Sequence, residues 1–184
     1  MDKMTFEETK LKGAYIVSLN LLTDARGGFA RTFCKKEFQQ IGHKKEFVQL
    51  NHSWNRNKGT IRGMHYQIPP YQEIKLIRCI RGAVLDVIVD LRKYSPTFLQ
   101  HVTVELSAEN KKMIYMPEDF AHGFQTLEDD SELIYHHTEY YTSDADRGLR
   151  FDDPALNIKW PLPPVMVSEK DKTYKLIDNT FKGI

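Results

Sequence analysis

The sequence contains only two cysteines, Cys34 and Cys79, among 184 residues. So few cysteines cannot form a disulfide framework, and a reducing cytoplasm is therefore the expected location. No apolar run approaches the roughly 18 residues needed to span a membrane, and the first ten residues lack the apolar core of a signal peptide. The formal net charge of +1 gives no reason to expect nucleic-acid binding.

Helical periodicity is also sparse, and strand signals dominate the chain. Short segments rich in Val, Ile, Tyr and Phe are separated by turn signals, which is typical of an antiparallel sandwich or barrel. These segments are AYIVSLNLL (14–22), GGFARTF (27–33), EFVQLNHSW (46–54), IKLIRCIRG (74–82), AVLDVIVDL (83–91), HVTVELS (101–107), KKMIYM (111–116) and SELIYHHTEYY (131–141). Short helices are expected only near the two ends, in residues 34–42 and 168–178, and one domain is expected to span residues 1–184.

The strand at 74–82 carries a lysine on the face that should be buried. Because side chains alternate along a strand, Lys75 shares its face with Ile77 and Cys79. Its ammonium is then expected to point into the barrel, where desolvation is costly unless an anion is present. The alternative is that Lys75 lies near the strand end and extends its head group to solvent.

The segment GTIRGMHYQ (59–67) combines Arg62, Gly63 and His65 in what is otherwise a strand pattern. Glycine inside a strand often marks a bulge or the close approach of a ligand, and imidazole is suited to proton transfer near neutral pH. By alternation, Arg62 and His65 fall on opposite faces unless Gly63 introduces a bulge. A binding pocket is one interpretation, and a structural histidine on an edge strand is the other.

Several histidines in a β-barrel raise the question of a metal. Barrels of this kind that bind metals usually carry His-X-His with a Glu on one strand and another His later. Here Gln67 stands two residues after His65, so the second histidine is missing. A set made of His65, Glu73 and His122 with Gln67 is a weak alternative, and metal-free chemistry is favoured.

Two polar segments offer groups for a nucleotide. Residues 22–33 place Arg26 and Arg31 around two glycines, where guanidinium and backbone groups suit phosphates. The alternative is an ordinary hairpin with solvated arginines. Tyr140 and Tyr141 are candidates for stacking on a base, or they are ordinary sheet aromatics.

Several motifs occur in an order that is similar to one known family. GTIRGMHYQ, KLIRCIRGAVLDVIVDLR, SPTF, VELSAENKK, MPEDFAHGF and VSEKD resemble the dTDP-4-dehydrorhamnose 3,5-epimerase family from about Thr9 to Asp171. The resemblance implies a mainly β, cupin-type antiparallel jelly-roll barrel, a homodimer, and no metal or other cofactor. It also implies an isomerase that inverts C3, C5 or both of a nucleoside-diphosphate-4-keto-6-deoxyhexose, in the synthesis of rhamnose or a related deoxyhexose for surface polysaccharide such as O-antigen.

The resemblance also implies roles for particular residues. His65 matches the base that removes the proton beside the ketone, and Asp171 matches its acidic partner. Tyr135 matches the acid that returns a proton from the opposite face, and Lys75 matches the lysine near the sugar carbonyl. Such a lysine stabilises the enolate that forms when the proton is removed. The expected substrate-binding residues are Arg26, Arg31, Gln49, Asn51, Arg62, His122, Tyr141 and Lys170.

Three positions depart from the family pattern. Arg31 replaces a Glu that lies near thymine in the family, and an arginine could donate to the acceptor at N3 of cytosine, which favours a CDP-linked sugar. The alternative is that Arg31 faces solvent or phosphate. Glu73 stands where the family usually has Gln, and His136 stands where it usually has Lys after the tyrosine. Either departure bears on whether one carbon or both are inverted.

Three other functions remain as alternatives. They are a 3,4-ketoisomerase acting on the same class of sugar, a metal-dependent cupin oxygenase, and a sugar-binding barrel without catalysis. The presence of Tyr135 together with His65 and Asp171 favours the epimerase.

Overall fold

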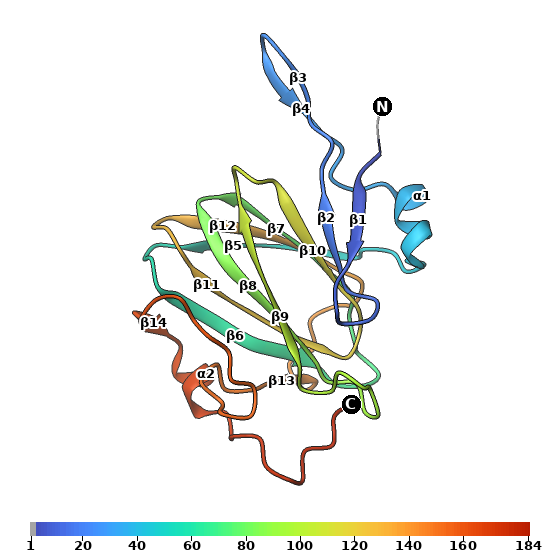
Figure 1. Cartoon of the computed structure of the whole chain (residues 1–184). Coiled ribbons are helices and arrows are strands. Elements are labelled where there is room, and N and C mark those ends of the chain that lie inside the picture. Colours follow the sequence, from blue (N-terminus) through green and yellow to red (C-terminus); the bar gives the residue numbers. More distant parts are fainter. Residues whose placement is uncertain (1–2) are drawn as a thin grey trace.

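The computed structural model describes residues 3–184, and two antiparallel sheets packed face to face make up its barrel (Figure 1). The first sheet has the strand order β1-β2-β10-β7-β12-β5, and the second has the order β13-β6-β11-β8-β9 with β14 paired in parallel to β6. A separate hairpin, β3–β4, extends away from the barrel (Figure 1). The strands are β1 (Thr5–Glu8), β2 (Tyr15–Ser18), β3 (Leu22–Asp24), β4 (Gly27–Phe29), β5 (Gln49–Asn55), β6 (Thr60–Gln67), β7 (Lys75–Arg81), β8 (Ala83–Asp90), β9 (His101–Ser107), β10 (Lys112–Met116), β11 (Phe120–Thr126), β12 (Ser131–His137), β13 (Asp146–Gly148) and β14 (Met166–Val167).

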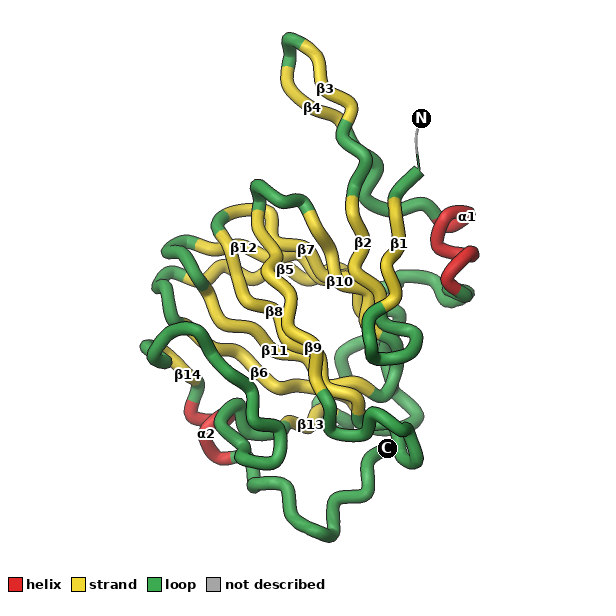
Figure 2. The backbone as a smooth tube through the Cα atoms, viewed as in Figure 1, coloured by secondary structure: helices red, strands yellow, loops and turns green. Residues whose placement is uncertain are grey.

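Helices are short and lie near both ends of the chain, as the sequence predicts (Figure 2). The first, α1 (Lys35–Phe38), continues into the 3-10 turn η1 (Gln39–Ile41). It stops at Gly42, whose φ of +81° suits glycine. The second, α2 (Glu169–Thr173), begins where the Ser168 side chain accepts a hydrogen bond from a backbone N–H. No helix in residues 3–184 is long and apolar enough to cross a membrane.

A hydrophobic core fills the space between the two sheets. Ile77 and Leu133 of the first sheet belong to the same buried cluster as Ile88 and Leu106 of the second. Lys75 lies on the interior face of β7, and its side chain is only 8% exposed. The prediction from alternation is therefore confirmed, and the alternative of a solvent-directed Lys75 is wrong.

A bulge in β6 brings Arg62 and His65 to the same side of the sheet. In the antiparallel ladder between β6 and β11, His65 lies opposite His122 and Arg62 lies opposite Phe124. Between these two positions β6 therefore advances three residues where β11 advances two. Gly63 lies within the extra length and has a φ of +113°. A Cβ on Gly63 would lie 2.6 Å from backbone atoms of β11, so only glycine fits. The predicted bulge is confirmed.

The strand predictions were wrong at a few places. Of the segment 27–33, only Gly27–Phe29 forms a strand. β1, β11 and β13 were not among the predicted strands, and of the segment 131–141 only Ser131–His137 forms a strand. In the proline-rich segment before α2, only the two residues of β14 form a strand.

Candidate active site

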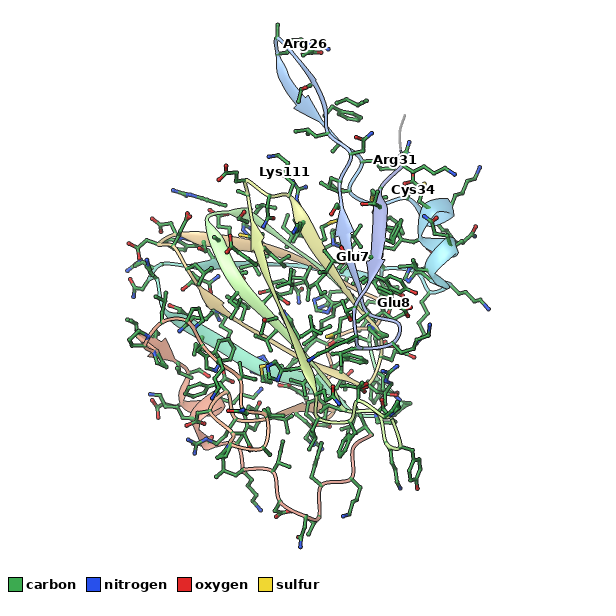
Figure 3. All side chains as sticks on the ribbon, in the orientation of Figure 1. Glu7, Glu8, Arg26, Arg31, Cys34 and Lys111 are labelled. Atoms are coloured by element: carbon green, nitrogen blue, oxygen red, sulfur yellow. The ribbon has the colours of Figure 1, made fainter. Side chains whose placement is uncertain are left out.

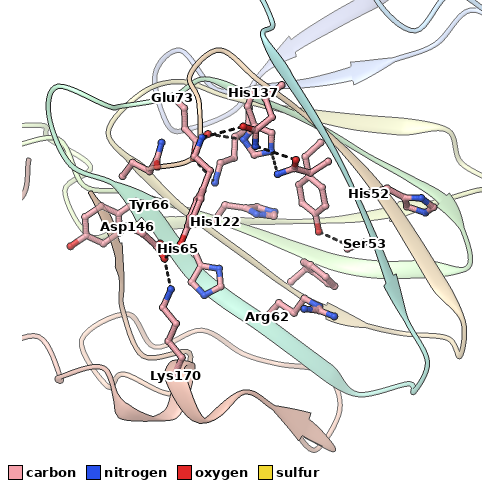
Figure 4. Close-up of a pocket in the computed structure, with 17 residues that line it drawn as sticks. His52, Ser53, Arg62, His65, Tyr66, Glu73, His122, His137, Asp146 and Lys170 are labelled. Carbon is pink, nitrogen blue, oxygen red and sulfur yellow. Dashed lines mark hydrogen bonds and ion pairs between the residues drawn. The ribbon is translucent and has the colours of Figure 1, made fainter. Parts of the chain in front are cut away.

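A cavity of about 360 Å³ lies between the two sheets (Figure 4). This volume is within the range of small-molecule binding sites. Strands β5, β7 and β12 of the first sheet and β6 and β11 of the second supply most of the lining. The lining residues are Gln49, Asn51, His52, Ser53, Arg62, His65, Tyr66, Gln67, Glu73, Lys75, His122, Phe124, Tyr135, His137, Tyr141, Asp146 and Lys170.

His65 and Asp171 form a hydrogen-bonded pair at the second sheet. His65 Nε2 lies 2.6 Å from Asp171 Oδ1, and the backbone N–H of Gly63 donates to Asp171 Oδ2 over 3.2 Å. Burial acts to raise the pKa of Asp171, but the hydrogen bonds from His65 and Gly63 outweigh it and lower that pKa. An ionised carboxylate only accepts hydrogen bonds, so His65 carries its proton on Nε2. Its Nδ1 then has the free lone pair that a general base needs.

Tyr135 faces the same cavity from β12, on the opposite sheet. Its hydroxyl forms a 3.0 Å hydrogen bond with Ser53 Oγ, and its ring centroid lies 5.9 Å from that of His122. Burial raises the pKa of Tyr135 above the ordinary value of 10. The phenol is therefore protonated at neutral pH and can act as a proton donor.

His122 belongs to a second buried histidine–carboxylate pair. Its Nε2 lies 2.8 Å from Asp86 Oδ2, and the side chains are 7% and 0% exposed. Sequence reasoning included His122 but missed Asp86 as its partner. The available signal was an aspartate inside the apolar run of β8.

Glu73, Lys75 and His137 form a third cluster on the first sheet. Lys75 Nζ lies 3.1 Å from Glu73 Oε1, and His137 Nδ1 lies 2.6 Å from Glu73 Oε2. Burial acts to raise the pKa of Glu73, but Lys75 and His137 outweigh it and lower that pKa. Glu73 is thus a buried carboxylate held in its charged form. His137 was not among the predicted site residues, whereas its neighbour His136 points away and contacts the Leu76 carbonyl.

Polar contacts also fix the exposed side of the cavity. Arg62 Nε donates to Asn55 Oδ1 over 2.6 Å. Lys170 forms an ion pair with Asp146 that raises the pKa of the lysine (Figure 4). The Tyr141 hydroxyl donates to the same carboxylate over 3.2 Å. Arg62, Tyr141 and Lys170 are exposed and lie at the edge of the cavity.

Gln49 and Asn51, two further predicted residues, point from β5 toward the cavity. Gln49 Nε2 donates to Asn51 Oδ1 over 3.1 Å, and Gln49 Oε1 accepts from the Tyr141 backbone N–H over 3.2 Å. With them, ten of the predicted side chains lie at this cavity, counting Asp171 as the partner of His65.

Arg26 and Arg31 are the two predicted site residues that one chain does not bring to the cavity. Arg26 lies at the tip of the β3–β4 hairpin (Figure 3) and pairs with Asp24 over 2.6 Å. Arg31 forms an ion pair with Glu37 of α1. Neither arginine lines the cavity.

The weak metal set is not assembled. Within the described residues 3–184, no group of three His, Cys, Asp or Glu side chains is placed to hold a metal ion. His65, Glu73 and His122 each have a different protein partner.

These features define the protein as a cupin-type barrel in which an oriented imidazole and a buried phenol face one cavity from opposite sheets. The comparisons with known proteins identify which barrel this is. The model of the dTDP-4-dehydrorhamnose 3,5-epimerase family matches residues 8–179, and the chain belongs to this family. The predicted family and the cupin-type jelly-roll fold are confirmed.

Individual relatives cover nearly the whole chain. A dTDP-4-dehydrorhamnose 3,5-epimerase from Shigella flexneri is 44% identical over 169 residues, which cover 91% of this chain and 93% of the relative. The crystal structure of the Bacillus anthracis epimerase with TDP and PPi bound has a TM-score of 0.92 at 40% identity, covering 95% of this chain and 100% of that one. A 3′-monoepimerase from Streptomyces bikiniensis in complex with dTDP-quinovose has a TM-score of 0.83 at 32% identity, covering 91% and 85%.

Proposed function

We propose that this protein is an isomerase that inverts C3, C5 or both of a dTDP-linked 4-keto-6-deoxyhexose, working as a single domain without a metal. The observation that carries the proposal is that His65 on β6 and Tyr135 on β12 approach one cavity from opposite sheets. Inversion at carbon requires a base on one face and an acid on the other. A cytoplasmic location remains a prediction, supported by the two cysteines, both of which are free.

The chemistry follows from the placement of the side chains. The ketone at C4 acidifies the hydrogens on C3 and C5, and His65 Nδ1 removes one of them. Asp171 stabilises the imidazolium that results, as a buried carboxylate beside an imidazole does. Lys75, whose side chain is only 8% exposed, stabilises the negative oxygen of the enolate. Tyr135 returns a proton to the other face.

Thymine is the base we propose for the substrate. Recognition of cytosine would need Arg31 as a donor, but the guanidinium of Arg31 is ion-paired with Glu37 and does not line the cavity. The relative from Bacillus anthracis has TDP bound. Turnover of the dTDP- and CDP-linked 4-keto-6-deoxyglucose, measured side by side, tests this choice. A strong preference for the CDP sugar would contradict it.

We also propose a homodimer in which Arg26 contacts substrate held by the other chain. The β3–β4 hairpin extends from the barrel and exposes Leu22 and Phe29, which are 44% and 61% exposed. A second chain that covers these side chains would bring Arg26 to its cavity. Mixing inactive Arg26→Ala and His65→Ala proteins should then restore activity, because a mixed dimer has one complete site. A monomer in sedimentation, or no restoration after subunit exchange, would contradict this arrangement.

The catalytic assignment is tested by two substitutions measured in heavy water. His65→Ala should abolish both deuterium exchange and inversion, with little loss of stability because His65 is 37% exposed. Tyr135→Phe should retain exchange while inversion falls, because the base is intact and the returning acid is absent. His101→Ala is the matched control, since His101 on β9 does not line the cavity. Equal loss of exchange and inversion in Tyr135→Phe would argue against Tyr135 as the acid.

A further inference from the structure

Glu73 shares its carboxylate between two cationic or donor groups beside the reaction site. One oxygen accepts from Lys75 Nζ at 3.1 Å and the other from His137 Nδ1 at 2.6 Å. All three side chains are at least nine-tenths buried, and all three line the cavity. Lys75 has a role in the proposed reaction, whereas Glu73 and His137 have none so far.

The hydrogen bonds continue from His137 to the exposed edge of the cavity. His137 Nε2 lies 3.2 Å from Asn51 Nδ2, Asn51 Oδ1 lies 3.1 Å from Gln49 Nε2, and Gln49 Oε1 lies 3.2 Å from the Tyr141 backbone nitrogen. Figure 4 shows the beginning of this chain at Glu73 and His137. It connects the lysine end of the cavity with the segment that carries Tyr141, whose side chain is 60% exposed.

The direction of every bond in this chain is determined by its two ends. The Tyr141 backbone N–H can only donate, and the ionised Glu73 can only accept. Each amide and the imidazole between them must therefore donate toward Glu73. His137 must then be neutral, with its proton on Nδ1 and its Nε2 lone pair accepting from Asn51. In any other state of His137, two N–H groups would oppose each other somewhere along the chain, and one of its hydrogen bonds would be lost.

We propose that Glu73 and His137 are positioning residues of this enzyme. Glu73 holds the ammonium of Lys75 at the enolate oxygen. His137 holds the carboxylate of Glu73, and hydrogen bonds through Asn51 and Gln49 connect His137 to the Tyr141 backbone. This inference rests on the proposed function, because it assigns Lys75 to the enolate.

Glutamate is needed at position 73 because only a carboxylate accepts from both neighbours. A glutamine would present one acceptor and one donor. If its oxygen accepted from Lys75, its amide N–H groups would face the Nδ1 proton of His137. The imidazole would then have to move its proton to Nε2, which breaks the chain at Asn51. The residue pair is therefore coupled, because a glutamine at position 73 would cost His137 its hydrogen bond with Asn51.

The first test is Glu73→Gln, assayed by the rate of deuterium exchange into the sugar. We expect exchange and kcat to fall about 10- to 100-fold, the typical result of a misplaced catalytic group, and KM to rise as well, because the hydrogen bond between His137 and Asn51 is lost. Glu118→Gln is the matched control, because Glu118 also pairs with a lysine, Lys45, but does not line the cavity. It should match wild type.

His137 is tested by two substitutions that separate its two contacts. His137→Asn keeps a donor near the position of Nδ1 and loses the contact with Asn51, so exchange should stay within about threefold of wild type while KM rises. His137→Leu loses both contacts and should reduce exchange as Glu73→Gln does. Combining Glu73→Gln with His137→Leu should cause no loss beyond that of Glu73→Gln alone, because the two residues act as one unit.

Each outcome decides the inference. Wild-type rates in Glu73→Gln, or losses that multiply in the double variant, would overturn it. If Glu73→Gln does not fold, the comparison of His137→Asn with His137→Leu decides instead, and equal exchange rates in those two would overturn the inference. No exchange by wild type would overturn the proposed function itself, which distinguishes the two failures.

Discussion

Replacing Asp171 with asparagine tests the pairing that makes His65 a base. The carboxylate accepts from two donors, His65 Nε2 at 2.6 Å and the Gly63 N–H at 3.2 Å. Asparagine has one oxygen acceptor and cannot serve both. If the oxygen faces Gly63, the amide N–H groups face His65, and the imidazole must carry its proton on Nδ1. That tautomer has no lone pair toward the substrate.

The size of the effect follows from the two ways in which the variant can respond. If His65 keeps its tautomer, the loss of a hydrogen bond to a charged group removes about 1.5–3 kcal/mol of imidazolium stabilisation, which is roughly 10- to 100-fold in rate. If the tautomer reverses, the loss approaches about 10⁴-fold, as in serine proteases with the same change. We therefore expect a decrease of about 10- to 10⁴-fold in exchange and in kcat.

The assay is deuterium exchange from heavy water at the sugar carbons, with melting temperature recorded in parallel. A variant that folds and retains a rate within about threefold of wild type would refute the proposed role of Asp171.

Three further substitutions address the fold that supports the site. Burial acts to raise the pKa of Asp90, but hydrogen bonds led by the one from Arg92 outweigh it and lower that pKa to about 2. Asp90→Asn should therefore reduce the free energy of unfolding by about 2 kcal/mol at pH 7. In urea unfolding, the variant and the wild type should become equally stable once the pH falls through the pKa of Asp90. Gly63→Ala should reduce the free energy of unfolding by at least about 2 kcal/mol more than Gly27→Ala does. Both glycines have a positive φ, but only Gly63 lacks space for a Cβ. Equal unfolding midpoints for the two variants would contradict this prediction. Ser168→Ala should cost about 1 kcal/mol by removing the acceptor at the start of α2, and an unchanged melting temperature would contradict that.

Alternation along strands was enough to predict parts of the site. Lys75 shares a face with Ile77 in the sequence and points inward in the structure. The glycine at position 63 indicated a bulge, and the register between β6 and β11 contains one. Both predictions succeeded because they depend on the period of a strand and on the conformational freedom of glycine, which are local properties.

Partnerships across strands could not be predicted in this way. Glu73 and His137 meet because β7 and β12 pair with one particular register, and the sequence alone does not give that register. Asp86 and His122 meet for the same reason across β8 and β11. Arg26 was assigned to the site by resemblance, and a single chain places it on a hairpin outside the cavity.

The central claim is that this barrel removes and returns a proton beside a ketone. The most direct test is incubation of the wild-type protein in heavy water with dTDP-4-keto-6-deoxyglucose, followed by NMR of the sugar protons. We expect deuterium at C3, C5 or both, with inversion at each labelled carbon. A folded protein that leaves both positions unlabelled, with this substrate and with its CDP counterpart, would contradict it.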